Sequence, residues 1–276
     1  MNMSDPGYLD RQYGTDEALR IRVETHRMYG VSSGEHLFDT ITRAMLEVGA
    51  RPAAILDVGA GTGNWYRAIR RQVGPDPQYT GVDQSAGMVQ ALTGTVMGDP
   101  RARVLAGDAE KLPCASESFD WVGLHFMLYH VPRIHLALQE AWRVLKPGGT
   151  LTAATNGPRP YRELADLGDE VAAELGLSGA GALSIERFNL ANGAQFFPAP
   201  PSVRVFPTGF RFPEAAPAVR YMASGPLWAH LGEAAQDAAI RERAVTVLRD
   251  RVEAAIRRDG SFNVHSESGF FLLRKG

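Results

Sequence analysis

The sequence predicts an α/β fold in which a doubly wound, mostly parallel sheet carries helices on both faces. Two observations support this prediction. Between residues 54 and 156, short apolar runs alternate with amphipathic stretches at the spacing of crossover connections. A glycine cluster, residues 59–63, directly follows the first apolar run. Such a cluster is typical of a turn that leads from a buried parallel strand into the next helix.

The elements of the sheet follow one another in a regular order. Five apolar runs are the predicted strands: residues 54–58, 79–82, 102–106, 121–126 and 150–155. Three amphipathic stretches between them are the predicted helices: residues 65–73, 85–93 and 134–145. Because each strand is followed by a crossover, the strands are expected to run parallel.

The flanks differ from this core. Two helices are expected before it, at residues 16–29 and 35–48. After it, residues 158–231 are irregular, and the proline-rich run at 197–201 interrupts any helix or central strand. An apolar stripe over residues 240–256 then predicts a long helix that ends at Gly260, and residues 270–273 predict a closing strand.

Composition narrows the class of function. The chain has 276 residues, of which 45% are apolar and 22% charged, as in ordinary soluble proteins. With 29 basic and 31 acidic residues, it has no positive surplus for a nucleic-acid backbone or an anionic membrane. Cys114 is the only cysteine, which excludes an intrachain disulfide and fits a reducing compartment. No signal peptide or membrane span is expected, and the histidines lack metal-ligand spacing, so we expect a cytoplasmic protein without a metal site.

The glycine cluster points to a nucleotide-like ligand. Alternate glycines let the backbone approach a ligand closely, and the next helix directs free N–H groups toward it. The dinucleotide pattern G-x-G-x-x-G is not met, because Asn64 stands where the third glycine is required. Asp83, at the end of the second strand, is placed to accept the ribose hydroxyls of an adenosine. Asp108, at the end of the third, is placed to accept an adenine amine, with the amide of Ala109 nearby.

Four motifs in this order resemble those of class I S-adenosylmethionine-dependent methyltransferases, of the bacterial small-molecule type. They are ILDVGAGTG at residues 55–63, VD at 82–83, GDAEKLP at 107–113 followed by FD at 119–120, and RVLKPGG at 143–149. The resemblance covers residues 52–156. It implies a Rossmann-like sheet of seven strands, mostly parallel with a reversed last strand, for which residues 270–273 are the candidate. It also implies S-adenosylmethionine as cofactor and S-adenosylhomocysteine as product.

The chain is expected to divide into four segments. Residues 1–48 are expected to form an N-terminal helical lid, and residues 49–157 the cofactor-binding core. Residues 158–232 are expected to be a substrate-cap insertion over the carboxyl edge of the sheet. Residues 233–276 supply the last helix and the closing strand. In the lid, Arg22, His26 and Tyr29 share one helix face. Arg22 is expected to contact the cofactor from this face, and the alternative interpretation is a solvated arginine beside aromatic rings that only pack.

Site residues follow from the motifs and their places. The expected cofactor contacts are Tyr13, Arg22, Asp57, Gly59, Ala60, Gly61, Gly63, Asp83, Gln84, Asp108, Ala109 and His125. Tyr29 and Asn156 are expected to face the substrate. Tyr129 and His130, after the fourth strand, are the candidates for a base or a substrate-orienting group. For His130, the alternative is a hydrogen bond that only fixes the loop.

The leading hypothesis is methyl transfer to an O, N or C nucleophile of a small molecule, such as a secondary metabolite. Because the sulfonium cofactor carries its own leaving group, the protein mainly has to align the reactants and exclude water. One alternative keeps the cofactor but catalyses a cyclisation or a decarboxylation. An RNA methyltransferase is a further alternative, although nucleic acid is disfavoured by the charge. A nicotinamide-dependent oxidoreductase is disfavoured by Asn64. Oligomeric state does not follow from the sequence.

Overall fold

The computed structural model describes residues 16–31, 37–177 and 186–276. The chain divides into two compact units. Residues 34–157, 186–205 and 268–276 form the first, here called the sheet unit. Residues 1–33, 158–185 and 206–267 form the second, here called the helical unit.

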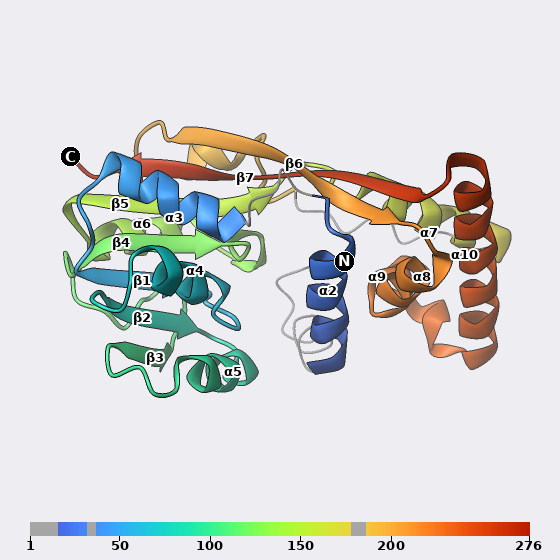
Figure 1. Ribbon diagram of the computed structural model, residues 1–276, viewed down its shortest axis with the longest axis horizontal. Coiled ribbons are helices and arrows are strands. Elements are labelled where there is room, and N and C mark those ends of the chain that lie inside the picture. The colour runs from blue at the N-terminus through green and yellow to red at the C-terminus, as the bar shows by residue number, and fades with distance from the viewer. Residues whose placement is uncertain (1–15, 32–36, 178–185) are drawn as a thin grey trace. The chain divides into compact units, whose positions relative to one another are not determined.

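Seven strands form one sheet in the order β3-β2-β1-β4-β5-β7-β6 (Figure 1). Their bounds are β1 Ala54–Val58, β2 Gln78–Asp83, β3 Ala102–Ala106, β4 Phe119–His125, β5 Leu145–Asn156, β6 Ser202–Phe212 and β7 Phe262–Arg274. The pairs from β3 to β5 are all parallel, and β7 runs antiparallel to β5, with Thr150 opposite Arg274. The predicted mostly parallel sheet with a reversed last strand is therefore confirmed.

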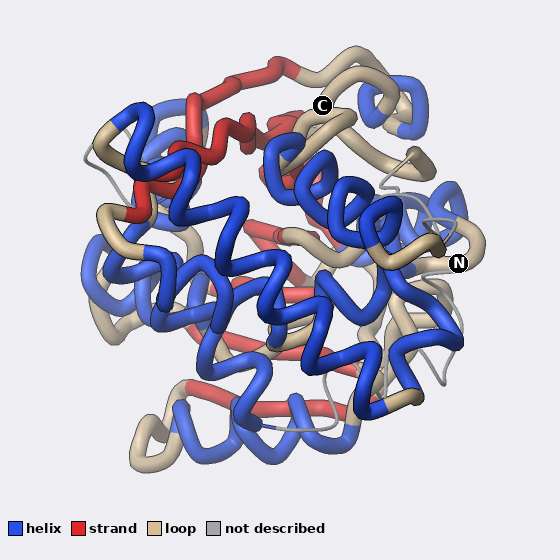
Figure 2. Tube along the Cα trace, turned by 90° about the vertical axis from the view of Figure 1, so that its right-hand side faces the viewer, coloured by secondary structure: helices blue, strands red, loops and turns tan. Residues whose placement is uncertain are grey.

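Helices alternate with the strands of the sheet unit along the chain (Figure 1), and Figure 2 distinguishes helices in blue from strands in red. They are α3 Leu37–Val48, α4 Asn64–Gln72, α5 Ala86–Val96 and α6 Ile134–Val144, with short 3₁₀ turns η1 Leu128–His130 and η2 Gly193–Phe196. Alternation along β1 divides its side chains between two layers. Leu56 and Val58 join the apolar core beside α6, which includes Leu138. Asp57 lies on the other face and receives a hydrogen bond from Tyr79 of β2.

The helical unit has its own core. Its helices are α2 Asp16–Tyr29, α7 Arg162–Glu174, α8 Ala215–Ala223, α9 Pro226–Leu231 and α10 Ala238–Asp259, with the 3₁₀ turn η3 Gly232–Gln236. Phe210, Phe212 and Leu248 are fully buried in this core. Asp237 caps the start of the long α10, and its carboxylate accepts backbone N–H groups of the first turn. The predicted Gly260, with a φ of 75°, caps its end.

The structure corrects the prediction for two segments. In the described part of residues 158–231, a segment expected to be irregular and partly helical, the helices α7, α8 and α9 agree with that expectation, but the strand β6 was not predicted. The proline-rich run does stay outside these elements, but β6 begins one residue after it. In addition, β5 begins at Leu145 rather than at the predicted residue 150, so it includes the Lys-Pro-Gly-Gly sequence that follows the predicted helix. The backbone N–H of Gly148 donates to the Lys275 carbonyl at 2.8 Å, which ties this stretch to the end of the chain.

The predicted segments and the two units do not follow the same boundaries. Helix α2 belongs to the helical unit, whereas α3 belongs to the sheet unit, as does the stretch 186–205 of the expected cap. The roles of lid and cap remain predictions. None of the helices in the described ranges is long and apolar enough to cross a membrane.

Candidate functional site

A glycine turn links β1 to α4. Gly59, Gly61 and Gly63 have φ values of 66°, 53° and 83°, in the left-handed region that glycine adopts without strain. The backbone N–H groups of Gly59 and Ala60 donate to the Val82 carbonyl at 2.8 and 3.1 Å. These bonds hold the turn against the end of β2.

The three glycines have different surroundings. A Cβ on Gly59 would lie 2.7 Å from Cγ of Met127, and one on Gly63 would lie 2.8 Å from Cδ1 of Leu92. At Gly61 a Cβ would meet no heavy atom within 4 Å. The turn is therefore packed against protein at both ends and open in the middle, where a ligand can approach the backbone.

Asp83 fixes the open part of the turn. Its Oδ2 accepts the backbone N–H of Gly61 at 3.0 Å, and its Oδ1 accepts that of Ser85 at 2.9 Å. Burial raises the pKa of this carboxyl, and the backbone donors oppose that rise. Ser85 in turn caps α5, and Gln84 between them is exposed. The carboxylate thus lies beside Gly61 with lone pairs left for a ligand.

Asp57 is a buried carboxylate directly before the turn. It is only 3% exposed, and its Oδ2 accepts the hydroxyl of Tyr79 at 2.8 Å. Burial raises its pKa to about 7, the Tyr79 hydrogen bond lowers it, and the charge of Asp83 raises it. No cation in the described ranges forms an ion pair with it. A buried carboxylate without a cation favours a ligand that brings a positive charge.

The end of β3 lies beside the same edge. The backbone N–H of Gly107 donates to the Asp83 carbonyl at 3.0 Å. Asp108 is exposed, and its Oδ1 accepts the Glu110 N–H at 2.9 Å, which orients the carboxylate. Ala109 is buried. The structure therefore brings the predicted Asp57, Asp83 and Asp108 to the carboxyl ends of adjacent strands.

His125 closes β4 with a buried ring. Its Nε2 lies 3.0 Å from Oγ1 of Thr152, and its Nδ1 has no hydrogen-bond partner in the part of the chain that the structure describes. Burial lowers its pKa to about 3, so the ring is neutral at physiological pH. The ring packs edge-on against Trp65 and Phe38, with centroids 4.6 and 5.8 Å away. The expected contact of His125 with a cofactor remains a prediction.

Tyr129 and His130 follow β4 in the 3₁₀ turn η1. Both are half-buried, and their ring centroids are 4.5 Å apart. The turn is held by the His130 N–H, which donates to the Met127 carbonyl at 2.9 Å. Just before it, Phe126 adopts a φ of 56°, which is uncommon for a residue other than glycine. Strained backbone of this kind often occurs at functional sites.

The remaining predicted residues are placed elsewhere. Asn156, at the end of β5, accepts the Ser268 hydroxyl at 2.7 Å through its Oδ1. Arg22 and Tyr29 lie on α2 in the helical unit. Burial raises the pKa of Tyr221 to about 12 and the charge of Arg22 opposes this rise, while the Tyr29 ring lies 5.3 Å from that of Phe212. Tyr13 lies outside the described residues.

Sequence reasoning missed two residues of this site. Met127 covers Gly59, and Tyr79 donates to Asp57. The only signal for Tyr79 is a tyrosine in a strand that otherwise reads as buried. Among the described residues, no group of three or more His, Cys, Asp or Glu side chains is arranged to hold a metal ion.

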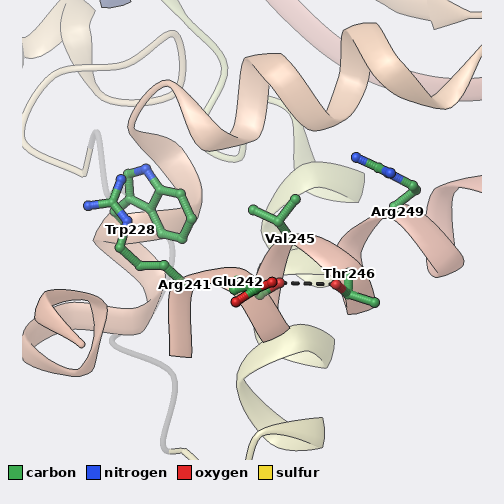
Figure 3. A pocket seen from close by; sticks show the side chains of 6 residues that line it. All are labelled: Trp228, Arg241, Glu242, Val245, Thr246 and Arg249. Atoms are coloured by element: carbon green, nitrogen blue, oxygen red, sulfur yellow. Dashed lines mark hydrogen bonds between the residues drawn. The ribbon is translucent and has the colours of Figure 1, made fainter. Parts of the chain in front are cut away.

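A shallow pocket occurs in the helical unit, between α9 and α10 (Figure 3). The Arg241 guanidinium lies 4.2 Å from the ring centroid of Trp228, and the Thr246 hydroxyl donates to the Glu242 carbonyl at 3.1 Å. Val245 and Arg249 complete the lining. None of these residues is a predicted site residue.

Comparison with known proteins identifies relatives of the sheet unit. A family model described as a methyltransferase domain matches residues 56–153. Demethylmenaquinone methyltransferase of Staphylococcus aureus is 40% identical over 108 residues, which are 39% of this chain and 45% of that enzyme. The chain thus spans less than half the length of the curated relatives it matches.

Two solved structures align with the whole chain. The [4+2]-cyclase SpnF is 18% identical, with a TM-score of 0.52, over 100% of this chain and 97% of that one. Phosphoethanolamine N-methyltransferase 2 of Haemonchus contortus is 18% identical, with a TM-score of 0.54, over 100% of this chain and 60% of that one. At this identity the structures show the fold alone. Taken with the motifs, the domain match shows that residues 56–153 are similar to the methyltransferase domain of class I S-adenosylmethionine-dependent enzymes.

Proposed function

We propose that the protein transfers a methyl group from S-adenosylmethionine to an O, N or C nucleophile of a small molecule. The observation that carries this proposal is the glycine turn, which is open at Gly61 and fixed there by the Asp83 carboxylate. The match to a methyltransferase domain supports S-adenosylmethionine as the cofactor and S-adenosylhomocysteine as its product.

The residues present fit such a cofactor. Asp83 would accept the ribose hydroxyls, and Asp108 with the amide of Ala109 would take the adenine. The ammonium group of the cofactor would supply the positive charge that buried Asp57 lacks among the described residues. The remaining backbone of the turn, with Gln84 and His125, would complete the contacts. The roles of Tyr13 and Arg22 in this site are part of the proposal.

The bound cofactor supplies an activated methyl group, so the chain has to align the acceptor and exclude water. Tyr129 and His130 are the candidates to orient the acceptor or remove its proton, since they directly follow the carboxyl end of β4. The buried, neutral His125 has no such role in the proposal. Tyr29 and Asn156 are proposed substrate contacts, and for Asn156 the amide N–H groups are the relevant ones, because Ser268 already donates to its oxygen.

The acceptor is proposed to be a small molecule that meets the enzyme in the cytoplasm. The net charge of −2 gives no general attraction for RNA. The name of the Staphylococcus aureus relative makes a demethylated menaquinone the first acceptor to test.

Calorimetric titration with S-adenosylmethionine, S-adenosylhomocysteine and NAD tests the cofactor. We expect micromolar binding of the first two, at least tenfold weaker in Asp83→Ala. Asp120→Ala is the matched control, because Asp120 also accepts two backbone N–H groups, those of Ala53 and Ala54, but at the amino end of β1. It should lower stability and leave affinity unchanged.

Binding of NAD alone, or of none of the three ligands, would refute the proposed cofactor. Release of S-adenosylhomocysteine during turnover, followed by mass spectrometry, tests the reaction itself. An acceptor converted without that release would identify the non-methylating alternative.

A further inference from the structure

We propose that Tyr79 is a positioning residue of the cofactor site, whose hydroxyl holds the Asp57 carboxylate in the orientation and charge state that bind the cationic end of the cofactor. This inference rests on the proposed function. It assigns a role to a residue that touches neither cofactor nor acceptor and acts only through Asp57.

The register of β1 and β2 places the tyrosine beside the carboxylate. Tyr79 pairs with Ile55, and Gly81 pairs with Asp57, so Tyr79 and Asp57 share one face of the sheet in diagonal positions. The hydroxyl reaches Oδ2 of Asp57 at 2.8 Å. Gly81 makes this reach possible, because a Cβ there would lie 3.2 Å from the Tyr79 hydroxyl and 2.4 Å from Cδ2 of Leu92.

The hydrogen bond is shielded from water and leaves half of the carboxylate available. Tyr79 is 1% and Asp57 3% exposed. Oδ1 of Asp57 accepts no hydrogen bond from any described residue. Burial and the nearby Asp57 charge raise the pKa of Tyr79 well above its ordinary value, so the phenol stays protonated and always donates.

The other polar groups on this face do not replace Tyr79. Asp83 on β2 is a second negative charge, which disfavours ionised Asp57. On α4, the Tyr66 hydroxyl donates to Asp99 at 2.8 Å, and Arg70 pairs with the same carboxylate at 2.7 Å. On β4, His125 is neutral.

The protonation state of Asp57 therefore depends on one hydrogen-bond donor. Burial raises its pKa to about 7, and the Tyr79 hydroxyl is the contribution that opposes this rise. Without the hydroxyl, Asp57 would hold its proton to higher pH. A neutral acid gives no ion pair with an ammonium group, so cofactor affinity near neutral pH would fall and would recover in alkaline solution.

The test compares S-adenosylhomocysteine binding by the wild type and Tyr79→Phe between about pH 6 and pH 8.5. If removal of the hydroxyl raises the Asp57 pKa by about one unit, affinity should fall nearly tenfold at about pH 6, about fivefold at pH 7 and less than about twofold at pH 8.5. Tyr66→Phe is the matched control. It removes an equivalent hydroxyl from the neighbouring ring, whose centroid is 5.0 Å from that of Tyr79, and should leave the pH profile unchanged.

If Tyr79→Phe weakened S-adenosylhomocysteine binding equally at every pH, the role of Tyr79 would be merely structural and the inference would be overturned. An unchanged pH profile in Tyr79→Phe, or the same shift of the profile in Tyr66→Phe, would also overturn it. Asp57→Asn gives a second measurement, which does not depend on the folding of Tyr79→Phe. It keeps an acceptor for the hydroxyl but no charge, so binding should be weak and flat with pH, and a wild-type profile would contradict the inference. Absence of binding by the wild type would instead refute the proposed function, and this inference with it.

Discussion

Replacement of Gly61 by alanine separates the stability of the glycine turn from its capacity to bind. The φ of 53° at this position is left-handed, which costs an alanine about 1–2 kcal/mol. Alanine recovers about 0.4–1 kcal/mol by restricting the unfolded chain. Since a Cβ here meets no heavy atom within 4 Å, there is no clash to add. We expect Gly61→Ala to lose only about 1 kcal/mol of unfolding free energy.

Binding should respond far more strongly. If the open space beside Gly61 is the ligand's, the new methyl group occupies it, and affinity for S-adenosylhomocysteine should fall more than about tenfold, which corresponds to about 1.4 kcal/mol. Urea unfolding and calorimetric titration of the same samples measure the two effects.

Gly98→Ala is the control for strain. Gly98 has a φ of 86°, and a Cβ at this position would also meet no heavy atom within 4 Å, but the residue lies outside the turn. It should show a similar loss of stability with unchanged affinity. Wild-type affinity in Gly61→Ala would refute the assignment of the turn as the ligand's surface. Equal loss of affinity in Gly98→Ala would show that strain alone explains the effect.

Three further predictions concern other groups. Burial raises the folded-state pKa of Asp57 to about 7, so the stability that its protonated form contributes is lost as pH rises toward 7. Burial lowers the folded-state pKa of His125 to about 3, so the stability that its neutral form contributes is lost as pH falls below about 6.5. These two trends oppose each other in the wild type. When the pH is lowered from about 6.5 to 5, the unfolding free energy of Asp57→Asn, measured with urea, should therefore fall by about 2 kcal/mol more than that of the wild type. Parallel pH dependences of the two unfolding free energies would contradict the opposed pKa shifts. His130→Gln should lower kcat at least about tenfold with little change in cofactor affinity if the ring removes a proton, and steady-state kinetics with unchanged kcat would leave it a loop-fixing role. Arg241→Ala should cost less than about 1 kcal/mol of stability, because it loses only an exposed contact with Trp228, and a large change in S-adenosylhomocysteine affinity would contradict the assignment of the site to the sheet unit.

The elements that the sequence predicts well are those with a local signal. The predicted bounds of strand β1, residues 54–58, are its observed bounds, because a short apolar run ends at a glycine. Strand β6 escapes prediction because it is the edge of the sheet: its first residues are exposed and Pro207 lies within it, so it lacks the pattern of a buried strand. An edge strand tolerates proline, since one side of its backbone needs no partner.

The site shows the same division. The turn and Asp83 carry motifs that can be recognised without a structure. The hydrogen bond between Tyr79 and Asp57 cannot be found in this way, since it joins residues 22 apart in the sequence. It depends on the register of β1 and β2 and on the absence of a side chain at Gly81. Likewise, nothing local to His125 indicates that its ring is buried against Trp65 rather than open to a ligand.

The division of the chain into interleaved segments has a consequence for biosynthesis. The sheet unit is completed only by residues 268–276, and the helical unit only by residues up to 267. During translation, β5 leaves the ribosome more than a hundred residues before its antiparallel partner β7, whose residues 268–274 pair with it. Until then that edge of the nascent sheet is an unpaired strand, which is open to association with other chains. Shielding of this edge, by a chaperone or by slow, dilute synthesis, should therefore govern the yield of folded protein.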